Sequence, residues 1–295
     1  MNRRGAVVAL WTACLIWGAA FPLTQMALAD ASPMAFTMLR FVGAAVLVAP
    51  GLPDLSRAEW RAGGLLGLLL ALGFATQTIG LGFTSASRSG FITALYVPLV
   101  PLIVLGVYRR LPGVAALVGL ALALTGMVLL TRTTGLGGGL NRGDLLTFGC
   151  AWCFAGHMVA AGAFARRYPA RHLMMAQVVV AGVLTTLFTP LVETPRVSPT
   201  PFLIAMVLYE AVLASVVAIQ LQIAAQRLIS PTYTALVLTL EPVVAALASL
   251  VLVGDRLQPL QWLGGMLIVA GSLMPEFRRG AATAGEPEPA PGDPA

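Results

Sequence analysis

Three charged side chains and one histidine lie deep within long apolar stretches of the chain, where they could bind a solute or move a proton. Glu210 and Glu241 are carboxylates, Arg40 is a cation, and His157 can gain or lose a proton near neutral pH. Inserting a charged side chain at the middle of a bilayer costs at least about 2.5 to 3.5 kcal/mol on insertion scales, so such residues usually have a function. The three charges are candidates for a coupling step driven by protonation, or for a structural role in which Arg40 neutralises a carboxylate.

Aromatic and amide side chains at similar depth could contact a small solute. Trp17, Phe21 and Gln25 share one helix face because they are spaced four residues apart. A glutamine facing lipid would leave its amide without hydrogen bonds, so Gln77 must face protein or water. Packing between helices is the alternative for Trp17 and Gln77, and a hydrogen bond between helices is the alternative for His157. The candidate substrate-binding residues are Trp17, Phe21, Gln25, Gln77, Tyr96, Trp152, His157, Tyr209 and Gln220.

Prolines within the apolar stretches mark candidate kinks. Pro98 has no amide hydrogen and frees the carbonyl group one turn earlier, near Ala94, which makes that stretch locally polar. Kinked helices are suited to gating. The candidate gating or kink positions are Pro22, Pro98, Pro101 and Pro242.

Motifs for catalysis, metals and nucleotides are incomplete in this sequence. Cys150 and Cys153 form a CxxC pair, but no second pair or nearby ligand set completes a metal site, so core packing is the expected role. The glycine-rich stretch GLGGGLNRGD, which begins at Gly135, lacks the GK[ST] ending of a phosphate-binding loop. We expect no catalytic residues, no bound metal, no cofactor and no drive by ATP.

The composition is that of an integral membrane protein. Of the 295 residues, 58% are hydrophobic and 10% are charged, against about 25% charged in soluble domains. The net charge of +6 comes from arginines in short loops, where positive charge sets orientation in a membrane, so nucleic acid is not an expected partner. The expected partners are the lipid bilayer and a small-molecule substrate.

Hydropathy divides the chain into ten candidate transmembrane helices, each close to the roughly 20 residues that cross a bilayer. Short connections favour antiparallel neighbours. If the N-terminus is cytoplasmic, twelve loop arginines lie on the inner side and five on the outer side, which predicts cytoplasmic N- and C-termini. The candidate spans are 7–27, 33–50, 62–82, 87–107, 112–131, 144–165, 172–192, 202–225, 231–253 and 258–275.

The two halves of the chain resemble each other. The stretch around Pro98 matches the stretch around Pro242, 144 residues later, and Trp17 stands opposite Trp152 in a second match. Five helices per half place the halves in opposite orientations in the membrane. The sequence therefore predicts an all-α fold of two inverted five-helix repeats, residues 1–136 and 137–276, around a central cavity. The tail, residues 277–295, is rich in proline, glycine and acids and is predicted to be disordered in the cytoplasm.

Several motifs together resemble a known family. LIWGAAFPLTQMALAD from Leu15, Arg40 within the second span, SASRSGFITALYVPL from Ser85 and SPTYTALVLTLEPVVAALASLVLVGDRL from Ser230 are similar to the ten-helix EamA-type members of the drug/metabolite transporter superfamily. The resemblance covers about residues 7 to 275 and implies two inverted repeats, a central cavity and a transport function. The glutamate-proline pair at Glu241 is a family motif, which favours an architectural role for Glu241 about as much as a substrate role.

The resemblance also implies a class of substrate. Bacterial members often export amino acids and related metabolites, and the size of this chain suits an amino-acid exporter of the YddG type in the bacterial inner membrane. We therefore expect a secondary transporter that works by alternating access, with its oligomeric state left open. The alternatives are an integral-membrane enzyme acting on a lipid or isoprenoid, and a transporter of a drug, a sugar or a nucleotide sugar.

Overall fold

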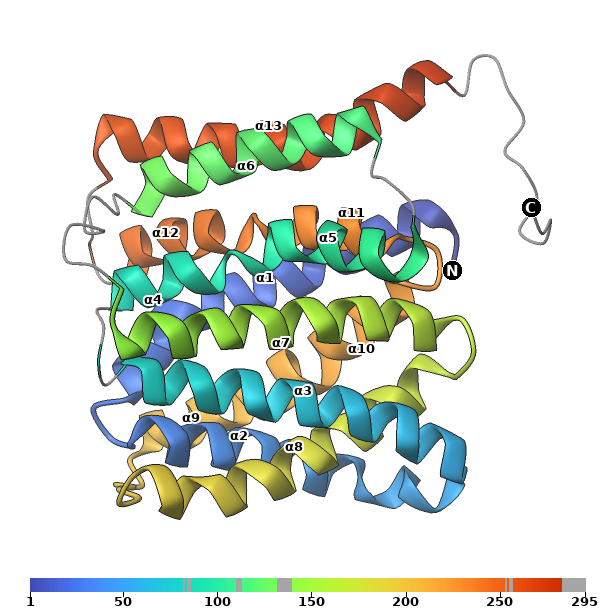
Figure 1. Cartoon of the computed structure of the whole chain (residues 1–295). Coiled ribbons are helices and arrows are strands. Elements are labelled where there is room, and N and C mark those ends of the chain that lie inside the picture. The colour runs from blue at the N-terminus through green and yellow to red at the C-terminus, as the bar shows by residue number, and fades with distance from the viewer. Residues whose placement is uncertain are drawn as a thin grey trace.

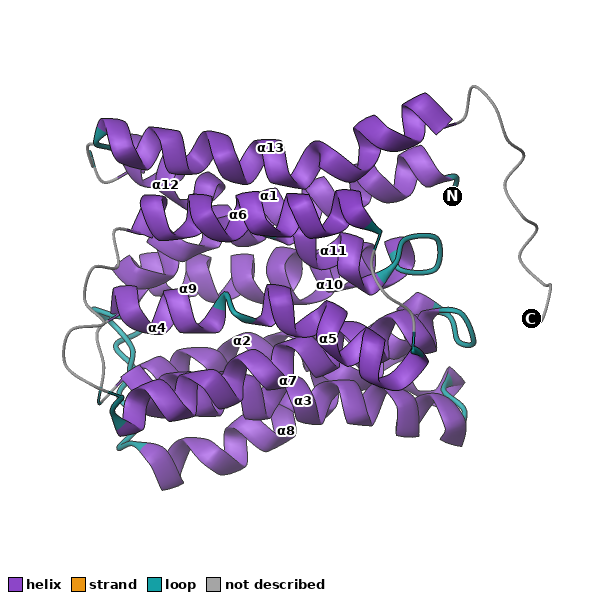
Figure 2. Ribbon diagram, turned by 45° about the horizontal axis from the view of Figure 1, so that its top comes forward, coloured by secondary structure: helices purple, strands orange, loops and turns teal. Residues whose placement is uncertain are grey.

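The protein is a bundle of roughly antiparallel helices, as seen in a computed structural model (Figures 1 and 2). The structure describes residues 1–81, 83, 86–109, 113–131, 140–252, 254 and 257–282. Within these ranges there is no β-strand, and one isolated antiparallel bridge joins Ala31 to Val197. The prediction of an all-helical fold is confirmed.

The helices account for most of the predicted spans. Seven are long and apolar enough to cross a membrane: Arg3–Ala27, Pro33–Asp54, Arg57–Gly80, Arg142–Ala165, Ala170–Val192, Pro201–Ala225 and Pro231–Leu252. Three shorter apolar helices are Tyr96–Tyr108, Val114–Leu130 and Pro259–Met274. The elements are α1 (Arg3–Ala27), α2 (Pro33–Val48), η1 (Ala49–Asp54), α3 (Arg57–Leu81), α4 (Ala86–Thr93), α5 (Tyr96–Tyr108), α6 (Val114–Thr131), α7 (Arg142–Ala165), α8 (Ala170–Val192), α9 (Pro201–Tyr209), η2 (Glu210–Val217), α10 (Ala218–Ala225), α11 (Pro231–Leu238), α12 (Glu241–Leu252) and α13 (Pro259–Ala282).

Three helices begin at a serine or threonine followed by proline. Proline is suited to the first helical position because its missing N–H has no partner there, and the hydroxyl before it can cap the helix. Thr200 accepts a hydrogen bond from the Leu203 amide at the start of α9, and Ser230 accepts one from the Tyr233 amide at the start of α11. At α2, Ser32 makes no such bond, and Glu193 accepts the hydrogen bond of the Ala35 amide instead.

Two of the predicted spans are interrupted. The span predicted over 87–107 divides into α4 and α5 at Ala94 and Leu95, one turn before Pro98. The span predicted over 231–253 divides into α11 and α12 at Thr239 and Leu240, just before Pro242. By contrast, Pro22 lies within unbroken α1 and Pro101 lies within unbroken α5. Proline therefore accompanies an interruption at two positions in these spans and lies within an unbroken helix at two others.

The last helix extends into the stretch predicted to be a disordered tail. Helix α13 ends at Ala282, beyond the predicted tail start at residue 277. Arginine and alanine in this stretch are strong helix formers, which favours continuation of the helix beyond the apolar part. The rest of the predicted tail, residues 283–295, lies outside the described residues.

Helices α6 and α13 form one edge of the bundle, and glycines allow their backbones to touch (Figure 1). A Cβ atom added at Gly119 would lie 2.5 Å from the carbonyl oxygen of Gly271, and one added at Gly271 would lie 2.5 Å from that of Gly119. Gly126 and Gly264 face each other in the same way. Small residues at such contacts are typical of membrane helices, where close backbone packing drives association.

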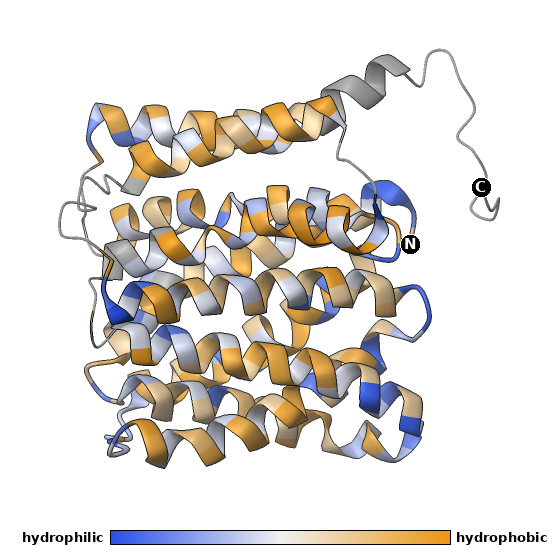
Figure 3. Ribbon diagram, in the orientation of Figure 1, coloured by the Kyte–Doolittle hydropathy of each residue, from blue (hydrophilic) through white to orange (hydrophobic). Residues whose placement is uncertain are grey.

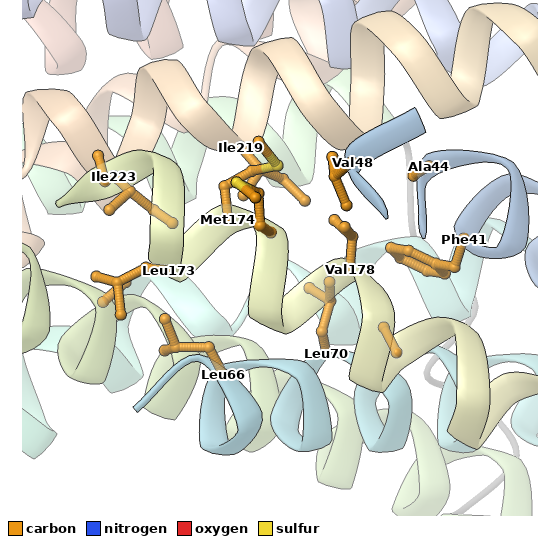
Figure 4. Packing of buried hydrophobic residues seen from close by; sticks show 14 of the residues in the cluster. Phe41, Ala44, Val48, Leu66, Leu70, Leu173, Met174, Val178, Ile219 and Ile223 are labelled. Carbon is orange, nitrogen blue, oxygen red and sulfur yellow. The ribbon is translucent and has the colours of Figure 1, made fainter. Parts of the chain in front are cut away.

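The opposite edge of the bundle is packed by large apolar side chains. Helices α2, α3, α8 and α10 enclose a buried cluster whose members interlock (Figure 4). Phe41 from α2, Leu66 from α3 and Leu173 from α8 are each fully buried there. Apolar residues line the lengths of the helices, and hydrophilic residues gather toward their ends (Figure 3). This distribution fits a membrane that surrounds the middle of the bundle.

Candidate functional site

A buried ion pair lies near the middle of the bundle. One guanidinium nitrogen of Arg40 (Nη1), on α2, lies 3.0 Å from Glu210 Oε2, and the two side chains are 14% and 4% exposed. Arg40 Nε also donates a hydrogen bond of 2.7 Å to Ser215 Oγ. The rings of Phe41 and Phe74 lie 5.1 and 5.3 Å from the guanidinium carbon, a distance at which a cation is attracted to an aromatic face.

Helix α1 is hydrogen-bonded to the same place. Thr24 donates to Glu210 Oε1 at 2.8 Å, Trp17 Nε1 donates to the Ala214 carbonyl at 2.9 Å, and Tyr209 donates to the Ile16 carbonyl at 2.8 Å. We call Trp17, Thr24, Arg40, Tyr209, Glu210 and Ser215 the Arg40 cluster. Both oxygens of Glu210 are compensated within it. The cluster joins α1 and α2 to the span made of α9, η2 and α10.

A π-helical turn positions the residues of this cluster. The segment η2 runs from Glu210 to Val217 between α9 and α10, and its carbonyl at Ala214 accepts the Trp17 indole. Such wide turns are rare and are frequent at functional sites. The sequence does not predict this π-helical turn, because the apolar residues around Glu210 are of the types found in an ordinary α-helix.

The two interrupted spans meet close to α1. Tyr96 is the first residue of α5, and Glu241 is the first residue of α12. Tyr96 and Cys14 lie close enough to Glu241 to interact electrostatically with its carboxylate. A Cβ atom added at Gly18 would lie 2.9 Å from the Glu241 carbonyl oxygen, so α1 packs directly on the first turn of α12. The structure therefore gathers Glu241, Tyr96 and Cys14 from three different spans.

An apolar pocket of about 150 Å³ lies between α1, the start of α12 and α13, and the exposed side chains of Trp11 and Leu15 form part of its lining. Cys14 of α1, Leu240 and Val243 on either side of Glu241, and Val269 of α13 are among the residues that line it. Its lining is apolar, so it is suited to a hydrocarbon group.

His157 and Gln77 make polar contacts outside the Arg40 cluster. His157 Nε2 lies 2.7 Å from Gln177 Oε1, and both side chains are buried between α7 and α8. Gln77 donates to Thr93 at 3.0 Å and so joins α3 to α4. The Oε1 atom of Gln220 is buried without a hydrogen-bond partner among the described residues.

Two other predicted substrate-binding residues, Trp152 and Gln25, are not brought to the cluster. Trp152 is 46% exposed and packs edge-to-face against Phe148. Gln25 is exposed near the end of α1. The side chain of Phe21 lies outside the described residues. The structure thus unites Trp17 and Tyr209 with Arg40 and Glu210, and places Tyr96 with Glu241.

At one end of the bundle, a network of hydrogen bonds joins two loops that are far apart in sequence. The stretch 28–32 and the stretch 193–200 pair at the bridge between Ala31 and Val197, where the Ser32 amide donates to the Arg196 carbonyl and the Ser198 amide donates to the Asp30 carbonyl. The Arg196 guanidinium donates to the Ala29 and Leu28 carbonyls, and Thr200 donates to Asp30. We call this contact the 31/197 clasp.

At the other end, a smaller contact joins α3 to α8. His172 Nδ1 lies 2.7 Å from Glu59 Oε1, while Glu59 Oε2 accepts hydrogen bonds from the Ser56 hydroxyl at 2.6 Å and the Ser56 amide at 2.7 Å. We call this contact the 59/172 clasp. The sequence predicts neither clasp, because polar residues in loops do not indicate which distant residues they contact.

Comparisons with known proteins identify relatives along nearly the whole chain. The model of the EamA-like transporter family matches residues 4–132 and again residues 141–274. An uncharacterized transporter of Archaeoglobus fulgidus is 31% identical over 278 residues, which cover 94% of this chain and 88% of that protein. A crystal structure of a protein with 21% identity superposes with a TM-score of 0.78 over 95% of this chain and 99% of that chain, which indicates the same fold.

The ion pair should show strong coupling in a double-mutant cycle. Arg40→Leu leaves the Glu210 carboxylate buried and unpaired, which costs about 3 to 5 kcal/mol in the free energy of unfolding. Arg40→Leu combined with Glu210→Leu removes both charges, and we expect it to cost less than the sum of the single variants. The measurement is denaturant unfolding in detergent micelles.

The control for this cycle is Arg61→Leu, which removes an exposed arginine near the start of α3. We expect it to change the free energy of unfolding by less than about 0.5 kcal/mol. If the costs of the two single variants add in the double variant, the Arg40 and Glu210 side chains do not stabilise each other. The ion pair would then contribute nothing to the free energy of unfolding.

Proposed function

The chain belongs to the EamA-like transporter family and is a multi-pass membrane transporter, and on that premise we propose that it exports small polar metabolites, amino acids first among them, by alternating access. The observation that carries this proposal is the Arg40 cluster. Its charged groups, Arg40 and Glu210, lie well inside their spans, and its contacts join helices from the two stretches that the family model matches. Polar groups at that depth are typical of solute pathways.

We further propose that the chain is built from ten spans in two inverted five-helix repeats. The two matches of the family model support this division. Gly264 follows Gly119 by 145 residues, and Gly271 follows Gly126 by 145 residues. The four glycines of the α6–α13 contact are therefore equivalent positions of the two proposed repeats, and each glycine contacts the counterpart of the other glycine in its own helix. The first residues of α5 and α12, Tyr96 and Glu241, are also 145 residues apart, one more than the 144 residues that separate Pro98 from Pro242.

Alternating access then has a physical basis in contacts between the proposed repeats. The 31/197 clasp joins a loop of the first matched stretch to a loop of the second at one end of the bundle, and the 59/172 clasp does so at the other. Opening one end requires hydrogen bonds of one clasp to be exchanged for water, while the contacts at the other end persist. The interruptions before Pro98 and Pro242 are natural places for the spans to bend.

The proposed substrate site lies between the repeats. Trp17, Tyr96 and Tyr209 offer aromatic faces and hydroxyl groups, and Arg40, Glu210 and Glu241 offer charge of both signs. This combination suits a zwitterion better than a multiply charged nucleotide sugar. His157, Trp152, Phe21, Gln25, Gln77 and Gln220 remain proposed substrate contacts on the sequence alone. The arginine distribution supports cytoplasmic termini, and we propose a bacterial inner membrane as the location.

Flux through liposomes tests the proposal. The purified chain is reconstituted, and efflux of labelled amino acids is compared with efflux of labelled sugars. We expect protein-dependent efflux of at least one amino acid, and Trp17→Ala should reduce its rate about tenfold, because it removes the indole that contacts η2. Trp262→Ala, a matched change at an exposed tryptophan of α13, should leave the rate unchanged. Efflux of sugars alone would refute amino-acid export, and equal rates in both variants would refute the site.

A cross-link at the 31/197 clasp tests alternating access. Ala31 and Val197 are a pair without mutual hydrogen bonds, because the amides of Ser32 and Ser198 donate on either side of them. Cα atoms in such a pair lie about 4.5 Å apart, within the roughly 4.4 to 6.8 Å that a disulfide spans. Oxidised Ala31→Cys/Val197→Cys protein should stop transporting, and a reductant should restore its rate. Full transport in the oxidised double variant would show that this clasp never opens.

A further inference from the structure

Exposed arginines gather at the end of the bundle where α3 and α8 begin and α7 ends, and Figure 3 shows hydrophilic residues at these helix ends. Two of the arginines lie in the first two turns of α3, two directly follow α7, and one is the second residue of α8. We call these five exposed residues the arginine corner: Arg57, Arg61, Arg166, Arg167 and Arg171.

The packing of the three helices brings these arginines to one end of the bundle (Figure 1). The 59/172 clasp joins the start of α3 to the start of α8. Helix α7 runs antiparallel to α3, because Gly73 of α3 packs on Phe154, whereas Gly80, one step further along α3, packs on the earlier residue Thr147. The end of α7 therefore lies beside the start of α3.

The arginine corner holds more positive charge than its acids neutralise. The acids in the described stretches at these helix ends are Asp54 and Glu59. Both oxygens of Glu59 are engaged by Ser56 and His172. Among the described residues, no ion pair joins any of the five arginines to a carboxylate. The corner is therefore suited to an anion from outside the chain.

The depth of the corner in a membrane indicates which anion it meets. Arg57 is the first residue of its candidate span, Arg171 is the second residue of its span, and Arg166 directly follows its span. Since the apolar length of a span fills the hydrocarbon core, its ends lie among the lipid headgroups. The guanidinium group presents paired N–H donors that match the oxygens of a phosphate. Basic residues gathered between membrane helices are typical of sites for anionic headgroups.

The arginines of the corner come from both stretches that the family model matches. Arg57 and Arg61 belong to the first stretch, and the other three belong to the second. A Cβ atom added at Gly51 would lie 3.1 Å from Arg171 Nη2, so the guanidinium of Arg171 lies on η1 of the first stretch. One phosphate at this corner is therefore within the reach of both stretches.

We propose that the arginine corner binds the headgroup of one anionic phospholipid, whose phosphate joins arginines of the two matched stretches beside the 59/172 clasp. The binding does not depend on the proposed transport function. In a chain that transports by alternating access, opening this end also breaks the contact with the lipid.

Native mass spectrometry of the purified full chain in a nonionic detergent tests the proposal, because it resolves chains that carry no lipid, one lipid or two. The probes are dioleoylphosphatidylglycerol, which is anionic, and dioleoylphosphatidylcholine, which has the same acyl chains and no net charge. We expect the first phosphatidylglycerol to bind at least about tenfold more tightly than the first phosphatidylcholine. Inorganic phosphate in large excess should not displace it, because phosphate lacks the acyl chains that anchor the lipid.

Single variants assign this lipid to the corner. Arg57→Gln and Arg171→Gln should each weaken binding of the first phosphatidylglycerol about fivefold, the contribution of one arginine near an anionic surface. The double variant should weaken it about twenty-five-fold, because the two losses multiply. The control is Arg4→Gln, which removes an exposed arginine at the start of α1, away from the starts of α3 and α8 (Figures 1 and 2). It should bind the lipid like the unmodified protein.

Three results would overturn the proposal. Equal affinity for the two lipids would show that charge is not recognised, and displacement by inorganic phosphate would indicate a site for a free anion. If Arg57 and Arg171 held separate lipids, either single variant would leave the affinity for the first lipid nearly unchanged, because the other site would still bind it. Should Arg171→Gln not give a monodisperse protein, Arg166→Gln removes a charge of the second stretch instead, with the same expected loss.

Discussion

Within a membrane, each polar group must find its partner inside the protein, and this constraint organises the middle of the bundle. Glu210 is compensated by Arg40 and Thr24, the Trp17 indole by the Ala214 carbonyl, and the Tyr209 hydroxyl by the Ile16 carbonyl. In each case the partners come from the two different stretches that the family model matches. These contacts of the Arg40 cluster thus join the two proposed repeats, and any motion between the repeats must exchange them.

The apolar packing places these contacts where motion is possible. At one edge, the glycine contacts of α6 and α13 bring backbone against backbone, and at the other, Phe41, Leu66 and Leu173 interlock between α2, α3 and α8. Both edges are held by close packing, which resists change because tightly packed surfaces lose their contacts when they shift. Between them lie interrupted helices and hydrogen-bonded side chains. Polar contacts can be exchanged for water or solute at low net cost, so we propose that the centre and the two clasps rearrange, and that opening the 59/172 clasp also loosens the adjoining packing of α3 on α8.

The sequence predicts those features that depend on neighbouring residues, and it does not predict contacts between residues that are far apart in the chain. Apolar length predicts membrane-spanning helices, and the isolated charges make Arg40 a candidate to neutralise Glu210 or Glu241, without indicating which carboxylate it meets. The prolines at 98 and 242 mark the two interruptions, whereas Pro22 and Pro101 lie in unbroken helices, so a proline alone does not predict where a span is interrupted. The π-helical turn at Glu210, the pairing of His157 with Gln177 and both clasps depend on residues far apart in sequence, and no local pattern indicates them.

The central claim is that the polar contacts at the two ends of the bundle open in alternation. Electron spin–spin distances measure this directly in liposomes, with one pair of labels at Ala29 and Thr194 beside the 31/197 clasp and a second pair, in a separate sample, at Ala58 and Arg167 near the 59/172 clasp. The account predicts two populations at each end, with a transported amino acid lengthening the distance at one end while it shortens the distance at the other. Single distances at both ends that do not change with the amino acid, in protein that still transports it, would contradict the account.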